Sequence, residues 1–219
     1  MNFDHLDNPV WYALTSQQQQ FAIGTEDVKC FQQHILPFAA YTTPETAHTL
    51  DPYLEDTFYM IGELPPLPSN WTVLKELRCV QMILQTPIEA MSNVSLLDAS
   101  HSQTMFDLIN KVQPGFYKPD TRLVGDYYGI WQDDKLVSIG GERLRMDHFT
   151  EISSIITDPE YTGRKYAQQL ITHVCNTNLS KGNIPFLHVL QTNDRAISLY
   201  EYLGFTQRRL ISFWQLKKA

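Results

Sequence analysis

The spacing of hydrophobic residues changes along the chain, and each change predicts a new element. Residues 127–131, 136–145 and 149–157 are rich in apolar and β-branched residues and are typical of strands. Asp133 and Asp134 lie between the first two runs and predict a hairpin turn. Beyond Gly163 the period lengthens to that of one helix face, which indicates a helix of about four turns. Its apolar positions are Tyr166, Ala167, Leu170, Ile171, Val174 and Cys175.

The remaining pattern after residue 94 adds two helices and three strands. Residues 94–97 are typical of a strand, and a helix follows with Ser102 as its N-cap and Pro114-Gly115 after its end. Residues 184–190 form a nearly continuous apolar run, as in a strand that is buried on both faces. Asn193 caps a last helix, Gly204 ends it, and residues 205–216 predict a final strand. The predicted order is therefore βαβββαβαβ.

The first 90 residues have a weaker pattern. Asn8-Pro9 predicts a helix start, and residues 57–62 predict a strand. Residues 35–41 fit a buried strand or a loop, and residues 64–69 are a proline-rich connector. Residues 73–84 fit a helix or a strand, because their apolar residues follow neither period consistently. We expect a smaller α/β region here.

Composition and charge then narrow the class of protein. The chain has 219 residues, of which 43% are hydrophobic, enough for a sizeable buried core. Its net charge of −7 argues against general nucleic-acid binding. Residues 1–90 carry three basic and eleven acidic residues, whereas residues 91–219 carry fourteen and thirteen. This asymmetry predicts two domains, residues 1–90 and residues 91–219, of which the second is the one suited to an anionic ligand.

Cysteine, histidine and hydropathy patterns point to a cytoplasmic protein without a metal. The three cysteines, Cys30, Cys79 and Cys175, lack the spacing of zinc or redox motifs and are interpreted as reduced thiols. His148 and His173 have no sequence partners that suggest a metal site. The amino-terminal residues are acidic, unlike a secretory signal, and no apolar run reaches the length of a membrane span. We expect no membrane partner.

The turn before the long helix is the most informative segment for chemistry. Gly163 allows close approach of an anion to backbone N–H groups at the helix start, and Arg164 and Lys165 add two cations. The spacing matches neither a Walker loop nor a dinucleotide-binding fingerprint. A pyrophosphate site is one interpretation, and a tight turn with two solvated cations is the other.

Two motifs in this region resemble the GNAT N-acetyltransferase superfamily. The family's phosphate loop reads Arg/Gln-x-x-Gly-x-Gly/Ala, and the corresponding segment is residues 162–167, which departs from it at Thr162 and Lys165. Residues 193–205 closely resemble the second motif, Asn-x-x-Ala-x-x-Leu-Tyr-x-x-x-Gly-Phe. Residues 151–155 and 185–189 look like the branch that includes the glycine N-acyltransferases. The predicted element order is also that of the family.

The resemblance implies both a fold and an activity. The fold would be α/β (α+β), a mixed and mostly antiparallel sheet flanked by helices, with residues 1–90 as a degenerate GNAT-like or substrate-covering unit. The activity would be transfer of an acetyl group from acetyl-CoA to a primary amine of a small molecule or peptide, without a metal. By the same resemblance the CoA-binding residues would be Ile155, Ile156, Thr157, Thr162, Gly163, Arg164, Lys165, Tyr166, Ala167, Asn193, Ala196 and Tyr200.

The resemblance also implies catalytic residues, each with a plainer alternative. Glu151 would be the general base, with Glu142 as the second candidate, and either could instead be a strand carboxylate without a catalytic role. Tyr200 would protonate the departing thiolate, or it is a core tyrosine with a satisfied hydroxyl. Asn193 would bind the pantetheine arm, cap its helix, or do both. His188 lies in a buried strand and is interpreted as a core histidine.

The sequence says less about the residues that would bind the acceptor amine. Phe116 and Tyr117, after the first helix, and Tyr128 could wall a pocket for a small amine, or residues 114–119 are a proline-rich surface loop. Two other functions stay open. The chain could bind CoA as a sensor without turnover, or its acidic first half could be a surface for a partner protein. We expect a monomer or a homodimer.

Overall fold

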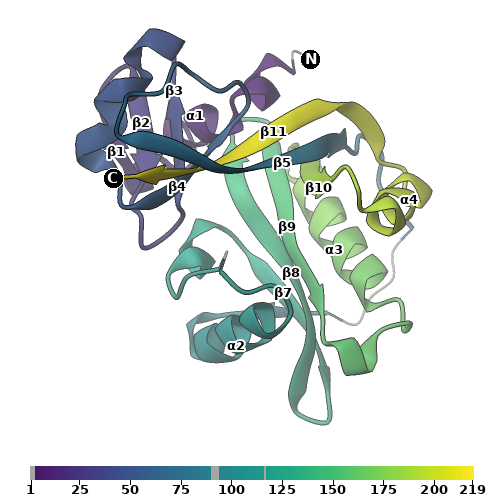
Figure 1. Ribbon diagram of the computed structural model, residues 1–219. Coiled ribbons are helices and arrows are strands. Elements are labelled where there is room, and N and C mark those ends of the chain that lie inside the picture. The colour runs from purple at the N-terminus through teal and green to yellow at the C-terminus, as the bar shows by residue number, and fades with distance from the viewer. Residues whose placement is uncertain (1–2, 90–93, 116) are drawn as a thin grey trace.

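One mixed sheet runs through the molecule in the computed structural model, which describes residues 3–89, 94–115 and 117–219 (Figure 1). In these residues eleven strands follow the order β1-β2-β3-β4-β11-β5-β10-β9-β8-β7-β6. The strands are β1 (Ala22–Gly24), β2 (Val28–Phe31), β3 (Phe38–Tyr41), β4 (Thr57–Ile61), β5 (Trp71–Ile83), β6 (Ser95–Leu97), β7 (Tyr127–Gln132), β8 (Lys135–Met146), β9 (Phe149–Thr157), β10 (Ile184–Leu190) and β11 (Thr206–Lys218). Most neighbouring strands are antiparallel, but β9 and β10 are parallel, as are β3 and β4.

The helices appear where the apolar periods place them. They are α1 (Pro9–Leu14), α2 (Ser102–Val112), α3 (Tyr166–Ser180) and α4 (Asp194–Tyr202), with short 3-10 helices η1 (Asp4–Asp7), η2 (Gln19–Phe21), η3 (Pro44–Tyr53), η4 (Ala99–His101), η5 (Thr121–Val124) and η6 (Pro159–Tyr161). From β6 onward the order is β6-α2-β7-β8-β9-α3-β10-α4-β11, which confirms the predicted βαβββαβαβ order and fold class.

The segment whose period was ambiguous, residues 73–84, forms most of the long strand β5. This strand lies between β10 and β11, so a strand from the first 90 residues completes the sheet of the second part. β5 pairs with β11 along its whole length, from Trp71 to Ile83, and with β10 only from Cys79 onward. The predicted division at residue 90 stays a prediction, but the sheet itself is continuous across it.

Helices cover both faces of the strands that carry the predicted site. α2 packs on one face through Met105, Leu108 and Ile109, against Tyr127 and Ile139 of the sheet. α3 packs on the opposite face through an apolar cluster of its own. These two faces are called below the α2 face and the α3 face. Figure 1 shows α2 and α3 on either side of β7–β9.

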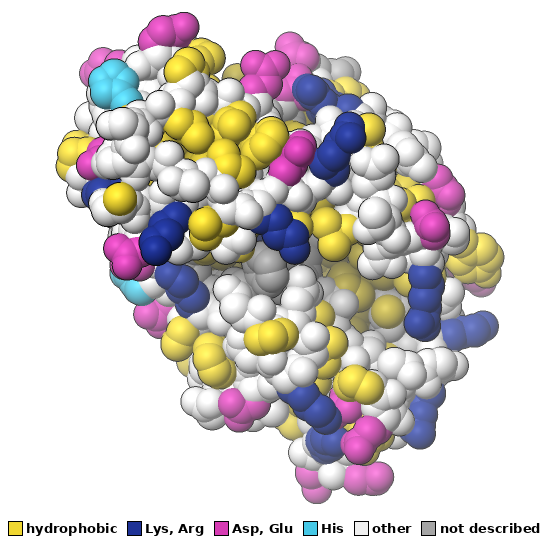
Figure 2. Space-filling model, viewed as in Figure 1, with side chains coloured by type: hydrophobic (Ala, Val, Ile, Leu, Met, Phe, Trp, Pro, Cys, Tyr) yellow, Lys and Arg dark blue, Asp and Glu magenta, His cyan; other side chains and the backbone are white. Residues whose placement is uncertain are grey.

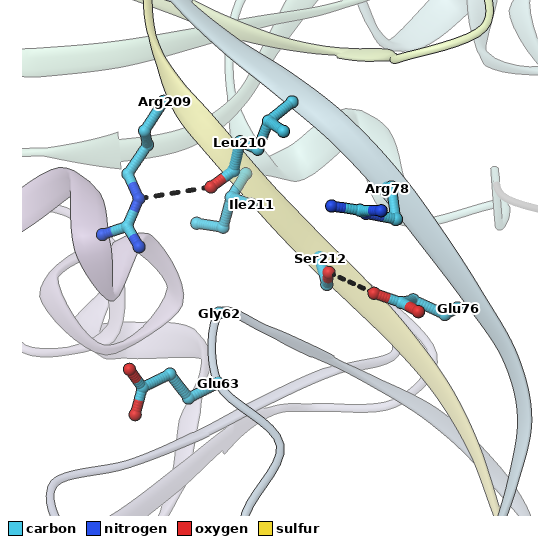
Figure 3. Close-up of a pocket in the computed structure, with 8 residues that line it drawn as sticks. All are labelled: Gly62, Glu63, Glu76, Arg78, Arg209, Leu210, Ile211 and Ser212. Atoms are coloured by element: carbon cyan, nitrogen blue, oxygen red, sulfur yellow. Dashed lines mark hydrogen bonds between the residues drawn. The ribbon is translucent and has the colours of Figure 1, made fainter.

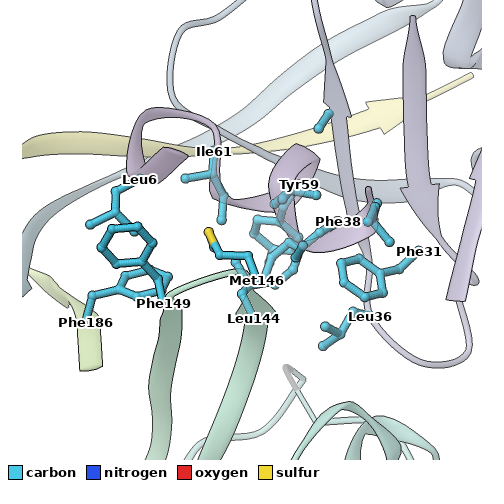
Figure 4. Close-up of a cluster of buried hydrophobic side chains, with 14 of the residues drawn as sticks. Leu6, Phe31, Leu36, Phe38, Tyr59, Ile61, Leu144, Met146, Phe149 and Phe186 are labelled. Carbon is cyan, nitrogen blue, oxygen red and sulfur yellow. The ribbon is translucent and has the colours of Figure 1, made fainter. Parts of the chain in front are cut away.

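A large apolar cluster joins the first 90 residues to the rest of the chain. Phe31 and Phe38 from the first part lie in one buried group with Leu144, Phe149 and Phe186 from β8, β9 and β10 (Figure 4). Each fully buried side chain of this size contributes about 1.5–3 kcal/mol relative to exposure. The first part is therefore packed firmly against the strands of the predicted site.

Candidate functional site

The predicted phosphate loop forms an exposed turn between β9 and α3. Residues 162–165 are exposed, and the backbone is left-handed at Gly163 (φ +80°) and again at Lys165 (φ +62°). A side chain in this conformation costs about 1–2 kcal/mol, which explains why the family pattern has glycine at the position of Lys165. The chain keeps the left-handed conformation although it carries lysine there.

The turn presents backbone donors at the start of α3. The N–H of Gln169 donates to Lys165 O at 3.1 Å, so the helical ladder begins there. The N–H groups of Tyr166, Ala167 and Gln168 come earlier and have no acceptor within the helix. Together with about half a positive charge from the helix dipole and the exposed cations Arg164 and Lys165, they suit a pyrophosphate.

A buried carboxylate fixes the segment that leads into this turn. Asp158 is 1% exposed, and its side chain contacts Lys111 Nζ at 3.0 Å and Lys135 Nζ at 3.1 Å. The hydrogen bond from Lys111 is the largest effect that lowers the pKa of Asp158, to about 2. The cations of Lys135 and Arg164 lie 4.9 and 5.1 Å from the centre of the Tyr161 ring. The turn is thus tied to α2 and β8.

Next to the turn, β9 loses its pairing with β10. The two strands pair at three positions, Phe149 to Glu151 with Ile184 to Phe186, and then diverge (Figure 1). From Phe186 to Leu190, β10 pairs with β5 on its other side. The predicted pantetheine-binding residues Ile155, Ile156 and Thr157 therefore lie on a part of β9 that no longer pairs with β10.

Glu151 lies at the point of divergence and is fully buried. Its carboxylate accepts hydrogen bonds from Arg143 Nε at 2.9 Å and Arg143 Nη2 at 2.5 Å, and it contacts His188 Nδ1 at 2.7 Å. Burial raises the pKa of Glu151, but the charge of Arg143 and the interaction with His188 outweigh it and lower the pKa to about 2. The guanidinium of Arg143 lies 5.1 Å from the Phe38 ring centre and 5.6 Å from that of Phe213.

Gln81, on β5, extends this network to the first 90 residues. Its Oε1 accepts from Arg208, at 2.8 Å, and its Nε2 donates to Leu6 O at 2.7 Å. These contacts orient the amide, so Nε2 donates also to His188 Nε2, at 3.0 Å. His188 must then accept at Nε2 and donate from Nδ1 to Glu151. His188 is a histidine with satisfied hydrogen bonds, as predicted, but its partner is the proposed base.

Glu142, the second candidate base, lies elsewhere. It is 1% exposed and accepts from Asn178 Nδ2 of α3 at 2.7 Å and from Asp126 N at 3.1 Å. Arg145 Nε lies 3.5 Å from its carboxylate. These contacts give Glu142 a structural role on the α3 face, and the structure does not bring it together with Glu151.

The second motif lies on α4, whose apolar residues pack against the cluster formed by α3. Asn193 caps α4 by accepting a hydrogen bond from Ala196 N at 3.1 Å, which confirms its capping role. Tyr200 is half-buried, and its ring packs edge-on against Phe205 at 5.6 Å. Burial raises the pKa of Tyr200 to about 12, so its hydroxyl stays protonated at neutral pH.

The predicted acceptor residues separate onto two faces. Tyr117 is buried on the α2 face and meets Tyr127 with ring centres 5.8 Å apart. Tyr128 follows Tyr127 on β7 and so points to the α3 face, where it packs on His173 at 4.5 Å. Tyr128 therefore cannot wall a pocket together with Tyr117. Phe116 lies outside the described residues.

The residues that sequence reasoning missed are Arg143, Gln81 and Tyr127. A strand-parity signal existed for Arg143, because it shares a parity with Ile139 and Gly141, which face inward, so a buried cation needing a partner was foreseeable. Nothing in the sequence pairs Gln81 with His188. For the acceptor pocket, the sequence analysis named Tyr128 and not the adjacent Tyr127.

A concave region lies away from all of these groups. It measures about 310 Å³ and is lined by both charged and apolar residues, where β4 ends beside β11 (Figure 3). Glu63, Glu76, Arg78 and Arg209 give it mixed charge. The face drawn in Figure 2 likewise mixes Lys and Arg with acidic side chains, without one continuous basic surface.

The described residues lack both a metal-binding cluster and a membrane-spanning helix. No three His, Cys, Asp or Glu side chains gather there in an arrangement that holds a metal ion. No helix among residues 3–89, 94–115 and 117–219 has the length and apolar character needed to cross a membrane.

Comparison with known proteins gives a family match and a structural relative that aligns over nearly the whole chain. Residues 127–214 match the family described as FR47-like protein. A crystal structure from Novosphingobium aromaticivorans, assigned to the GNAT family of acetyltransferases, has 30% sequence identity and a TM-score of 0.91. The alignment covers 98% of each chain. No curated protein sequence matches the chain.

More distant structures share the fold alone. A GCN5-related N-acetyltransferase from Kribbella flavida has 11% identity and a TM-score of 0.60, over 95% of this chain and 91% of that one. A GNAT-family acetyltransferase from Colwellia psychrerythraea has 14% identity and a TM-score of 0.55, over 66% of this chain and 58% of that one.

Proposed function

Because the chain belongs to the GNAT family of acetyltransferases, we propose that it moves an acetyl group from acetyl-CoA to a primary amine by direct attack in a ternary complex. The observation that carries this proposal is the exposed turn of residues 162–167. It has two left-handed positions, leads into α3, and lies beside the part of β9 that has left β10. A diphosphate and an extended pantetheine arm need these two features side by side.

The residues present fit acetyl-CoA. The N–H groups of Tyr166 and Ala167 would hold the pyrophosphate, with Arg164 and Lys165 as nearby cations. The backbone from Ile155 to Thr157 would bind the pantetheine arm as an added strand. A β9 N–H would donate to the thioester oxygen as negative charge develops there, a contribution of about 3 kcal/mol in other enzymes.

The charge state of Glu151 constrains how the amine reacts. A carboxylate with a pKa of about 2 takes a proton weakly from an ammonium group, whose pKa is about 10. This favours an electrostatic role for Glu151 and requires that the acceptor binds as the neutral amine. Tyr200 remains the proposed donor to the departing thiolate, since its hydroxyl is protonated at neutral pH.

Thermal unfolding with CoA tests the binding half of this proposal. CoA at about 100 times its Kd should stabilise the protein by about 2.7 kcal/mol. Arg164→Glu should weaken this stabilisation, whereas the matched variant Arg78→Glu should leave it intact. Within the described residues neither arginine forms a salt bridge, and Arg78 lies instead at the cavity of Figure 3. Absence of any stabilisation would sink the proposal.

Release of free thiol from acetyl-CoA with a panel of primary amines tests the chemical half. We expect turnover whose apparent KM for the total amine rises about tenfold for each unit by which the pH lies below the amine pKa, because only the neutral form reacts. CoA binding without turnover would favour the second function, a CoA sensor. That alternative has support in the buried, fully engaged carboxylates of Glu142 and Glu151.

Several finer predictions stay predictions. These are the branch that includes the glycine N-acyltransferases, the cytoplasmic location, the monomeric or homodimeric state, and the roles of Phe116, Tyr128 and Asn193 toward ligands. A role of residues 1–90 as a cover over the acceptor is consistent with their packing against β8 and β9.

A further inference from the structure

Two buried hydroxyl groups meet on the α2 face without a hydrogen-bond partner. Tyr117 is 5% exposed and Tyr127 is 2% exposed, and neither phenol oxygen has a partner at hydrogen-bond distance among the described residues, although the Ser154 side chain interacts with the Tyr127 hydroxyl. A buried hydroxyl without a partner costs about 1–3 kcal/mol. Two such groups on tyrosine rings in edge-to-face contact, at 5.8 Å, are therefore a costly feature that needs a reason.

The chain makes room for Tyr127 with a glycine. A Cβ added to Gly141 on β8 would lie 2.4 Å from Tyr127 Cδ1 and 2.7 Å from its Cγ, closer than any real contact. The ring therefore packs directly against the backbone of β8 at Gly141. Any other residue at position 141 would displace the ring.

The Tyr127 hydroxyl lies close enough to β9 to interact with the side chain of Ser154. Gly141 pairs with Ser153 of β9, and the next residue, Ser154, has a left-handed backbone (φ +55°). This irregularity lies three residues beyond Glu151, where β9 leaves β10. Ser153 and Ser154 are partly exposed, so this part of β9 is accessible to solvent.

The surroundings select the kind of group that the hydroxyls would bind. Leu97, Met105, Leu108 and Ile109 surround the two tyrosine rings with apolar side chains. Burial is the main cause that raises the pKa of both tyrosines, so both remain neutral. The buried cation Arg143 is already paired with Glu151, and Arg122, whose charge acts on Tyr117, is only partly buried. An ionised group would therefore lose its hydration here without a buried, unpaired counter-charge.

We propose that Tyr117 and Tyr127 recognise the acyl acceptor, and that this acceptor carries an uncharged hydrogen-bonding group, a hydroxyl or a carboxamide, close to its reactive amine. This inference rests on the proposed acetyl transfer. It adds the chemical class of the acceptor and two specificity residues on the α2 face.

Matched amines and matched variants test the inference. The amines are ethanolamine with propylamine, which differ in a hydroxyl against a methyl, and glycinamide with glycine, which differ in charge. The variants are Tyr117→Phe, Tyr127→Phe and, as a control, Tyr41→Phe, whose hydroxyl donates to Glu63 O at 2.7 Å far from the site. Thiol release gives kcat/KM for each amine, and thermal unfolding with CoA is measured in parallel.

With kcat/KM referred to the concentration of neutral amine, we expect the wild-type protein to favour the uncharged polar amine of each pair about tenfold or more, because an apolar analogue leaves the site's hydroxyls unpaired. Tyr127→Phe should remove this preference through KM and keep CoA stabilisation, while Tyr41→Phe keeps the preference. Two results would overturn the inference and indicate that the hydroxyls serve only bound water. One is a wild-type protein that shows no preference within the amine pairs. The other is a preference that Tyr127→Phe retains. A preference for glycine over glycinamide overturns the uncharged class.

Failure of this inference and failure of the proposed function give different results in these measurements. Loss of CoA stabilisation in the wild-type protein would refute acetyl transfer itself. Normal CoA stabilisation and turnover, with the same ranking of amines in wild type and Tyr127→Phe, would leave acetyl transfer intact and refute the two-tyrosine site.

Discussion

Replacement of Glu151 by Gln tests how the buried charges at the site are balanced. Glutamine keeps the size of the side chain but removes the charge that Arg143 and His188 contact. Arg143 would then remain in the apolar cluster around Phe38 and Phe213 without its counter-charge. We expect a large loss of stability, because the lone buried cation keeps its desolvation cost.

The pKa of Glu151 gives the size of the effect. Its fall from 4.5 to about 2 on folding corresponds to about 3 kcal/mol, at about 1.4 kcal/mol for each pH unit. Because the folded-state pKa is the lower one, this contribution is complete above pH 4.5 and is lost as the pH falls toward 2. Less than half of it, roughly, remains near pH 3.

Urea unfolding of wild type and Glu151→Gln at pH 7 and near pH 3 measures this contribution. We expect a difference of about 3 kcal/mol at neutral pH that narrows at the lower pH. Glu160→Gln is the control, because Glu160 is exposed and should change stability by less than about 0.5 kcal/mol. A stable Glu151→Gln protein that has lost only turnover would refute this reasoning and support Glu151 as the base.

Three further substitutions probe the backbone and the caps. Lys165→Gly should raise the free energy of unfolding in urea by about 0.5 kcal/mol, because it removes the strain of a left-handed side-chain residue. Lys165→Ala should give no such increase. Destabilisation by glycine would contradict the left-handed geometry of the loop. Gly141→Ala should destabilise by about 1–3 kcal/mol through its clash with Tyr127, and a tolerated alanine would show that the ring lies elsewhere. Asn193→Ala should cost about 1 kcal/mol in thermal unfolding, while Asn193→Asp keeps the cap; equal loss in both would argue against capping.

Local patterns predicted the elements of the second part well, for physical reasons. α3 carries its apolar residues at a strict helical period, and Gly204 follows α4 where a left-handed residue is needed (φ +94°). β5 was ambiguous because most of its residues 72–78 are exposed, so no single buried face shapes their pattern. Its place between β10 and β11 depends on pairing between distant segments, which local periods do not encode.

The candidate site likewise combines residues that a local sequence pattern predicts with residues that it does not. The turn at Gly163 was predictable because a glycine and two cations before a helix are a local pattern. The ionic network was not, since Arg143, Glu151, His188 and Gln81 come from four different strands and are joined only by tertiary packing. The left-handed backbone at Lys165 was also hidden, because lysine does not signal it as glycine does.

Amide hydrogen exchange with and without CoA most directly tests the central claim that backbone N–H groups at the start of α3 hold the diphosphate. The account predicts slower exchange in peptides that cover residues 152–157 and 163–168 when CoA is present. Unchanged exchange in both segments, with protection around Arg78 and Arg209 at the cavity of Figure 3 instead, would contradict it.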